Sequence, residues 1–231
     1  MFQKILIANR GEIAVRIIRA CREMGIKTVA VYSEADRDAL HTLLADEAIC
    51  IGPAPSTESY LDMERILTAC VVMKADAIHP GFGFLSENAR FAELCEKCNI
   101  RFIGPSAEII NKMGNKSEAR KTMMAAGVPV VPGSKEPVYT VEEGLKTAKE
   151  VGFPVMIKAS SGGGGKGMRV SRSEEDFEAN FLNAQMESVK GFSDNTMYIE
   201  RFVENPRHIE FQILGDRYGN VVHLGERDCS L

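Results

Sequence analysis

The chain has 231 residues, of which 45% are apolar, and a formal net charge of −4. This length suits one large or two small domains with real cores, and the acidic balance excludes a surface that is basic overall and binds nucleic acid. No apolar run reaches the roughly 18 residues of a membrane span, so we expect no membrane segment.

The first residues and the cysteines indicate a cytoplasmic protein. The start, Met1 to Ile7, lacks the long apolar stretch and cleavage site of a secretory signal and is typical of a first strand. We therefore expect the six cysteines to be reduced. Cys95 and Cys98 form a lone C-x-x-C, for which a structural role is favoured because metal sites usually need a second pair.

Strands and helices alternate from the start to about Gly104. Short apolar runs predict buried strands at 4–8, 28–32, 48–51, 77–79 and 101–103. Helical spacing of apolar residues predicts helices at 13–24, near 39–45, 60–69 and 88–97. A right-handed crossover makes such a sheet parallel, so the expected fold class is α/β with an open, doubly wound parallel sheet.

Three loops follow these strands at the edge where ligands bind in such folds. They are the charged turn 9–12, the stiff turn 52–56 and the long loop 79–88. In the long loop, a hydrogen-bonded structural role for His79 is favoured over a catalytic one. Ser86 is the expected N-cap of the following helix.

The second half has a different pattern. Helices are expected at 107–113 and 116–126, then a turn-rich hinge at 127–133 and a helix at 140–151 that begins with a capping box of Thr140 and Glu143. Lys116 lies at the start of its helix, where an anion is favoured, although a lone lysine is usually solvated surface. Strands at 154–158 and 168–171, and a helix at 173–190 capped by Ser173, complete a small α/β unit.

Four consecutive glycines, Gly162, Gly163, Gly164 and Gly165, join the two strands of that unit, and Lys158, Lys166 and Arg169 flank them. Backbone N–H groups of glycine can approach a phosphate closely, so this stretch predicts a phosphate cradle. The alternative is a flexible linker, which apolar flanking strands disfavour. The spacing is not a Walker A motif, and the strand that follows excludes a dinucleotide-binding turn.

The last residues predict a strand at 197–203, then a two-stranded ribbon at 208–214 and 221–224. The ribbon ends with nothing to complete its sheet, and such a ribbon is marginal alone. We therefore expect the sequence to be a piece of a longer protein.

Together these motifs resemble biotin carboxylase, an ATP-grasp enzyme, along the whole chain. The motifs are those of the stretches 4–14, 52–61, 79–88, 102–105, 157–170 and 204–228. The resemblance implies a Rossmann-like pre-ATP-grasp domain (1–113), a helical connection (114–131), an ATP-grasp lid (132–203) and the start of an antiparallel catalytic sheet (204–231). The Gly52–Ser56 turn is most similar to the bacterial acetyl-CoA carboxylase subunit, which serves fatty acid synthesis.

The resemblance also implies a reaction and a site. ATP and bicarbonate form carboxyphosphate, Mg²⁺ bridges the phosphates, and CO₂ passes to the biotin of a carrier protein for a carboxyltransferase. Lys116 and Lys158 neutralise the phosphates, Gly162 to Gly165 cover them and Met168 packs on the adenine. Glu200, Arg201, Phe202 and Val203 link the lid to the base, with Glu200 and the Val203 backbone at the adenine edge, and His208 reaches the ribose or phosphates.

The same resemblance places the catalytic base and the metal ligands beyond residue 231. We therefore expect no catalytic or metal-binding residue here and no carboxylation by this stretch alone. Arg201, Val203 and Lys166 replace the Lys, Leu and Arg common in the family. Arg19 and Glu23 are implied contacts of a homodimer, with a solvated helix face as the alternative.

Other functions remain open at this point. They are the biotin carboxylase domain of pyruvate or another acyl-CoA carboxylase, another ATP-grasp ligase of carbamoyl-phosphate or purine metabolism, and a nucleotide-binding or assembly module. A dinucleotide oxidoreductase is the weakest option, because no glycine fingerprint follows the first strand.

Overall fold

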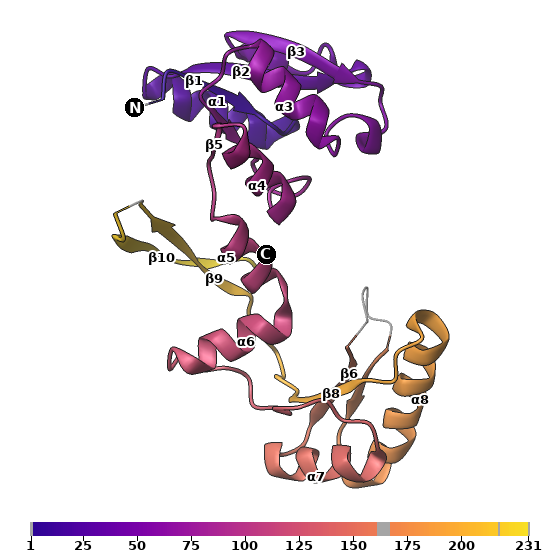
Figure 1. The fold of residues 1–231 in the computed structure, drawn as a ribbon. Coiled ribbons are helices and arrows are strands. Elements are labelled where there is room, and N and C mark those ends of the chain that lie inside the picture. The colour runs from indigo at the N-terminus through magenta and orange to yellow at the C-terminus, as the bar shows by residue number, and fades with distance from the viewer. Residues whose placement is uncertain (1, 161–166, 217, 231) are drawn as a thin grey trace. The chain divides into compact units, whose positions relative to one another are not determined.

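The structure is a computed structural model that describes residues 2–160, 167–216 and 218–230. The side chains of residues 116, 117 and 192 lie outside the description. The chain divides into two compact units, Met1–Val128 and Pro129–Leu231, and each is described by itself (Figure 1).

The first unit is built on a five-stranded sheet with the order β3-β2-β1-β4-β5, and all neighbours in it are parallel. Its strands are β1 (Lys4–Ile7), β2 (Lys27–Ser33), β3 (Glu47–Gly52), β4 (Ala77–His79) and β5 (Arg101–Phe102). Its helices are α1 (Gly11–Glu23), α2 (Leu40–Leu44), α3 (Met63–Val72), α4 (Ala89–Lys97), α5 (Ala107–Gly114) and α6 (Lys116–Ala125). The predicted parallel α/β fold is confirmed.

Both faces of this sheet are covered. Along β1, Leu6 faces a cluster with Phe91 and Tyr60, whereas Ile5 and Ile7 face a second cluster built with α1. All of these side chains are at most 4% exposed. Because side chains alternate along a strand, a strand that is apolar on both sides is a fully buried strand of a layered α/β domain.

Four helices of the first unit, α1, α3, α4 and α6, end in the same way. A backbone N–H donates to the carbonyl five residues earlier, at 2.8–3.0 Å. This is a Schellman motif, whose turn requires a left-handed residue. Gly25 and Gly127 serve in α1 and α6, but Lys74 (φ 53°) and Asn99 (φ 57°) serve in α3 and α4.

One predicted helix start and one predicted N-cap are wrong. Helix α3 begins at Met63 rather than residue 60, because the Asp62 side chain accepts the hydrogen bond of the Arg65 N–H. Helix α4 is capped by Asn88, whose side chain accepts from the Phe91 N–H, and not by Ser86. In both cases an Asp or Asn side chain satisfies an orphan N–H of the first turn.

The second unit contains a three-stranded antiparallel sheet with the order β7-β6-β8, called here the small sheet. Its strands are β6 (Val155–Ala159), β7 (Met168–Ser171) and β8 (Met197–Arg201), and its helices are α7 (Val141–Val151) and α8 (Glu174–Phe192). Thr140 caps α7 as predicted, although Glu143 accepts from the N–H of Tyr139 rather than from the cap. Figure 1 shows α7 and α8 beside this sheet.

A hairpin of β9 (Ile209–Gly215) and β10 (Val221–Asp228) follows. Strand β10 extends four residues past the predicted end at Leu224, because a register shift between His223 and Glu226 restores the pairing. Its apolar side chains are exposed, including Phe211 at 59% and Leu224 at 66%.

Candidate functional site

The small sheet has one covered and one open face. On the covered face, Val155, Ile157 and Ile199 pack with Phe177 and Phe181 of α8 and are fully buried. The register places directly paired residues on the same side. The open face therefore consists of residues that are neither fully buried nor packed under a helix: Met156, Lys158, Met168, Val170, Tyr198 and Glu200.

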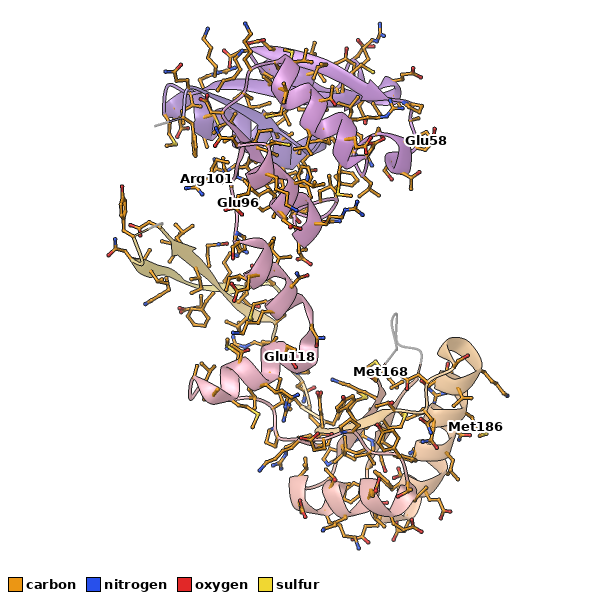
Figure 2. All side chains as sticks on the ribbon, in the orientation of Figure 1. Glu58, Glu96, Arg101, Glu118, Met168 and Met186 are labelled. Atoms are coloured by element: carbon orange, nitrogen blue, oxygen red, sulfur yellow. The ribbon has the colours of Figure 1, made fainter. Side chains whose placement is uncertain are left out.

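Three of the predicted site residues thus lie together. Lys158 and Met168 are direct cross-strand partners, and Lys158 lies diagonally across from Glu200, with which it forms an ion pair. The side chains of this pair are 36% and 28% exposed, so water still reaches both charges. Met168 is labelled in Figure 2.

The sequence reasoning missed Met156, Val170 and Tyr198. Their signal was the two-residue period of β6, β7 and β8, which puts each on the side of Lys158 or Glu200. With Met168 they form an apolar surface around a lysine and a carboxylate. Such a surface can take a flat ring, while the ammonium group of Lys158 can bind an anion.

The segment 132–134 fixes the exit of β8. The N–H of Arg201 donates to the Pro132 carbonyl at 2.8 Å, and the N–H of Ser134 donates to the Ile199 carbonyl at 2.7 Å. A Cβ at Gly133 would lie 2.5 Å from the Ile199 oxygen, so only glycine allows this approach. The backbone of Val203, by contrast, has no hydrogen-bond partner in the part of the chain that the structure describes.

Other predicted site residues lie elsewhere or outside the description. Gly162, Gly163, Gly164 and Gly165 lie outside the described residues. Lys116 begins α6 in the first unit, but its side chain is not described. Arg201 is exposed on the edge of the small sheet next to the half-buried Phe202, and His208 is exposed just before β9.

The carboxyl edge of the first sheet carries a polar network on three of its strand ends. Asp36 accepts from the hydroxyls of Tyr60 (2.6 Å) and Ser33 (2.9 Å). Arg10 lies over the rings of Tyr60 and Phe84, at 5.4 and 5.6 Å from their centroids. Burial and the bond to Asp36 raise the pKa of Tyr60 to about 12. For Asp36, burial favours the neutral acid, but these hydrogen bonds and Arg10 outweigh it and lower the pKa.

The loop 79–88 is held on the same edge. The buried Asn9 side chain donates to the carbonyls of Pro80 (2.7 Å) and Phe82 (2.8 Å). Nδ1 of His79 accepts from the Gly81 N–H at 3.1 Å, and burial lowers the pKa of His79. These contacts agree with the structural role predicted for His79.

Within the described residues, no group of three or more His, Cys, Asp or Glu side chains has the geometry to hold a metal ion. Cys95 is buried and Cys98 is exposed. None of the described helices is long and apolar enough to cross a membrane.

Comparison with known proteins gives two family matches. Residues 1–110 match the model of "Biotin carboxylase, N-terminal domain" and residues 115–231 match "Carbamoyl-phosphate synthase L chain, ATP binding domain". The biotin carboxylase of Nostoc sp. is 61% identical over 230 residues, which are 100% of this chain and 52% of that protein. The chain therefore spans about half the length of the curated relatives it matches.

Two solved structures share the fold. One is a biotin carboxylase–βγ-ATP complex from Campylobacter jejuni, with a TM-score of 0.84, 54% identity and coverage of 99% of this chain and 51% of that one. The other is the biotin carboxylase domain dimer of the Hydrogenobacter thermophilus 2-oxoglutarate carboxylase with MgADP, ADP and bicarbonate. Its TM-score is 0.82 and its identity is 54%, and the match covers 100% of this chain and 51% of that one.

Proposed function

Since the chain belongs to the biotin carboxylase family, we propose that it supplies the nucleotide-binding part of an ATP-dependent biotin carboxylase. In this reaction bicarbonate oxygen attacks the γ-phosphorus of ATP, and ADP leaves. The resulting carboxyphosphate breaks down to phosphate and CO₂, which the N1′ nitrogen of biotin takes up as it loses its proton. Phosphoryl transfer depends on positioning and charge neutralisation more than on a protein nucleophile.

One observation carries this proposal: Lys158, Met168 and Glu200 share the open face of the small sheet. We propose that the adenine lies on the apolar residues of this face and that its edge meets Glu200 and the backbone of Val203. Lys158 then leaves Glu200 for the phosphates, because a polyphosphate carries more charge than one carboxylate. Lys116, Gly162 to Gly165 and His208 are proposed as further nucleotide contacts.

We propose the domain division 1–113, 114–131, 132–203 and 204–231, with 132–203 as the lid. The ammonium group of Lys158 would bind the phosphates of ATP. The described residues, however, offer no ligand set for Mg²⁺. The ion would be held by phosphates and by carboxylates supplied from the rest of the enzyme.

The finer assignment is a cytoplasmic acetyl-CoA carboxylase subunit in fatty acid synthesis. Its partners would be a biotin carboxyl carrier protein and a carboxyltransferase. A homodimer through Arg19 and Glu23 of α1 is supported by the exposure of both side chains and by the dimer named for the Hydrogenobacter structure. The same relative, a 2-oxoglutarate carboxylase, also supports the alternative of a keto-acid carboxylase domain.

The test is ATP hydrolysis by the complete enzyme that contains this stretch. We expect hydrolysis that requires bicarbonate and rises with free biotin, and a loss of at least tenfold in the Lys158→Ala variant. Lys146→Ala, a lysine on the far side of α7, is the matched control. Hydrolysis stimulated by an amine instead of biotin would contradict the proposal and favour another ATP-grasp ligase.

A further inference from the structure

The two ends of the glycine-rich stretch are fixed by a small set of hydrogen bonds. The N–H of Ala159 donates to the Gly167 carbonyl at 2.8 Å, and the N–H of Ser160 donates to the Thr196 carbonyl at 2.9 Å. The N–H of Gly167 donates to Oε2 of Glu187 at 3.1 Å. Of these three acceptors, only that of Glu187 belongs to a side chain, so this bond can be removed by substitution.

Glu187 also binds the residue on the other side of Met168. Its Oε2 lies 3.1 Å from Nη2 of Arg169, and Nη1 of Arg169 donates to the Met168 carbonyl at 2.8 Å. Arg169 is paired with the buried Ile157, so it lies on the covered face, toward α8. One carboxylate of α8 thus holds both neighbours of Met168, while Met168 itself belongs to the open face.

The packing of α8 allows this contact. Its residues Ala184 and Ser188 are fully buried and small, and a Cβ on Gly167 would lie 3.9 Å from the Ser188 Cβ and 2.8 Å from the Ala159 Cβ. Gly167 has φ 68°, which a side chain would strain. The backbone at Gly167 is therefore pressed close to the helix, within reach of the Glu187 carboxylate.

We propose that Glu187 is a positioning residue of the nucleotide site, which binds the Gly167 N–H before Met168 and the Arg169 guanidinium after it and so holds Met168 on the open face. This role rests on the proposed function, in which Met168 packs on the adenine. Because Glu187 acts through Gly167 and Arg169 and lies on the covered side, it does not itself touch the nucleotide.

The test compares Glu187→Ala, which removes both contacts, with Glu187→Gln, which keeps an acceptor for Gly167 but loses the charge beside Arg169. Glu178→Gln, an exposed carboxylate of the same helix, is the control. Two quantities are measured on the 231-residue chain by NMR: exchange of the Gly167 amide, and the midpoint of the Met168 methyl shift during titration with millimolar ATP.

We expect Glu187→Ala to raise both amide exchange and the ATP midpoint by about tenfold, Glu187→Gln to have a smaller effect, and the control to change neither. A merely structural role would instead speed exchange equally in β6 and β8. That result, or an unchanged ATP midpoint in Glu187→Ala, would overturn the proposal. If ATP shifts no methyl even in the unaltered chain, the proposed adenine surface on the open face fails, and the positioning role fails with it, whereas the exchange data still report the Gly167 contact.

Discussion

The two sheets of this chain differ in how many faces they bury. The sheet of the first unit is covered on both sides, so its strands carry apolar residues toward two clusters. The small sheet is covered on one side only, and its other side alternates apolar residues with Lys158 and Glu200. A sheet buried on both faces can present polar groups only at its ends, where Arg10, Asp36 and Tyr60 meet, whereas a sheet with a free face can hold a ligand along its strands.

The largest expected effect tests whether the covered face is a core. Phe177 is fully buried and contacts Phe153 and Phe181. We expect Phe177→Ala to lower the free energy of unfolding of the second unit by about 3–5 kcal/mol, because the two remaining rings cannot fill the cavity. Leu182→Ala on α8, which is 41% exposed, is the control. Chemical denaturation, followed by hydrogen exchange in β6 and β8, measures the unfolding free energy of both variants. Equal losses in Phe177→Ala and Leu182→Ala would contradict a core on one side of the sheet.

A smaller effect is expected at the end of the first sheet. Tyr60→Phe removes a hydroxyl that donates to Asp36 and accepts from the Ser33 N–H at 3.0 Å. Because Ser33 is fully buried and its N–H loses the hydroxyl to which it donates, we expect a loss of about 1–3 kcal/mol in the unfolding free energy. Tyr32→Phe, a half-buried tyrosine of β2, should change it by less than about 0.5 kcal/mol. If the two variants unfold alike in urea, the network does not stabilise the first unit.

Acid should lower the unfolding free energy of the first unit through His79. Burial lowers the pKa of His79 below its ordinary 6.5, so the unfolded chain takes up a proton that the folded chain does not. Stability is then complete above pH 6.5 and falls as the pH drops below it. We expect His79→Asn, which preserves an acceptor for Gly81, to reduce the loss of stability of the first unit between pH 7.5 and 5.5. An unchanged pH dependence in urea titrations would refute a neutral, buried His79.

The smallest effect concerns the left-handed turn after α3. Lys74 has φ 53°, which glycine adopts without a Cβ penalty. We expect Lys74→Gly to raise the unfolding free energy of the first unit by about 0.5–1 kcal/mol. Lys97→Gly makes the same change in the last turn of helix α4, where the backbone is helical, and should lower stability by a similar amount. Thermal unfolding compares the two, and shifts of the same sign would exclude strain at Lys74.

Much of the fold follows from the sequence. Buried strands such as 4–8 and 28–32 are apolar throughout, and the parallel sheet follows from their alternation with helices. Helix starts were less certain where several residues can cap: Ser86 and Asn88 are both good caps, and only the packing of Phe91 in the core selects Asn88. The extent of β10 could not be predicted, because its register shift depends on pairing with β9.

The site was predicted in part. The resemblance named Lys158, Met168 and Glu200, but their common face depends on the pairing register of three strands. That register also adds Met156, Val170 and Tyr198. Glu187 gives no motif signal, because its role arises where α8 approaches Gly167.

The open face as a nucleotide surface is tested most directly by methyl NMR of the 231-residue chain labelled at its methionines. Met156 and Met168 lie on the open face, whereas Met197 of the same sheet is fully buried in the core of the second unit. With millimolar ATP we expect the methyl signals of Met156 and Met168 to shift together, with Met197 unchanged, and both shifts to weaken in Lys158→Ala. Shifts confined to methionines of the first unit, or an equal shift of Met197, would contradict this account.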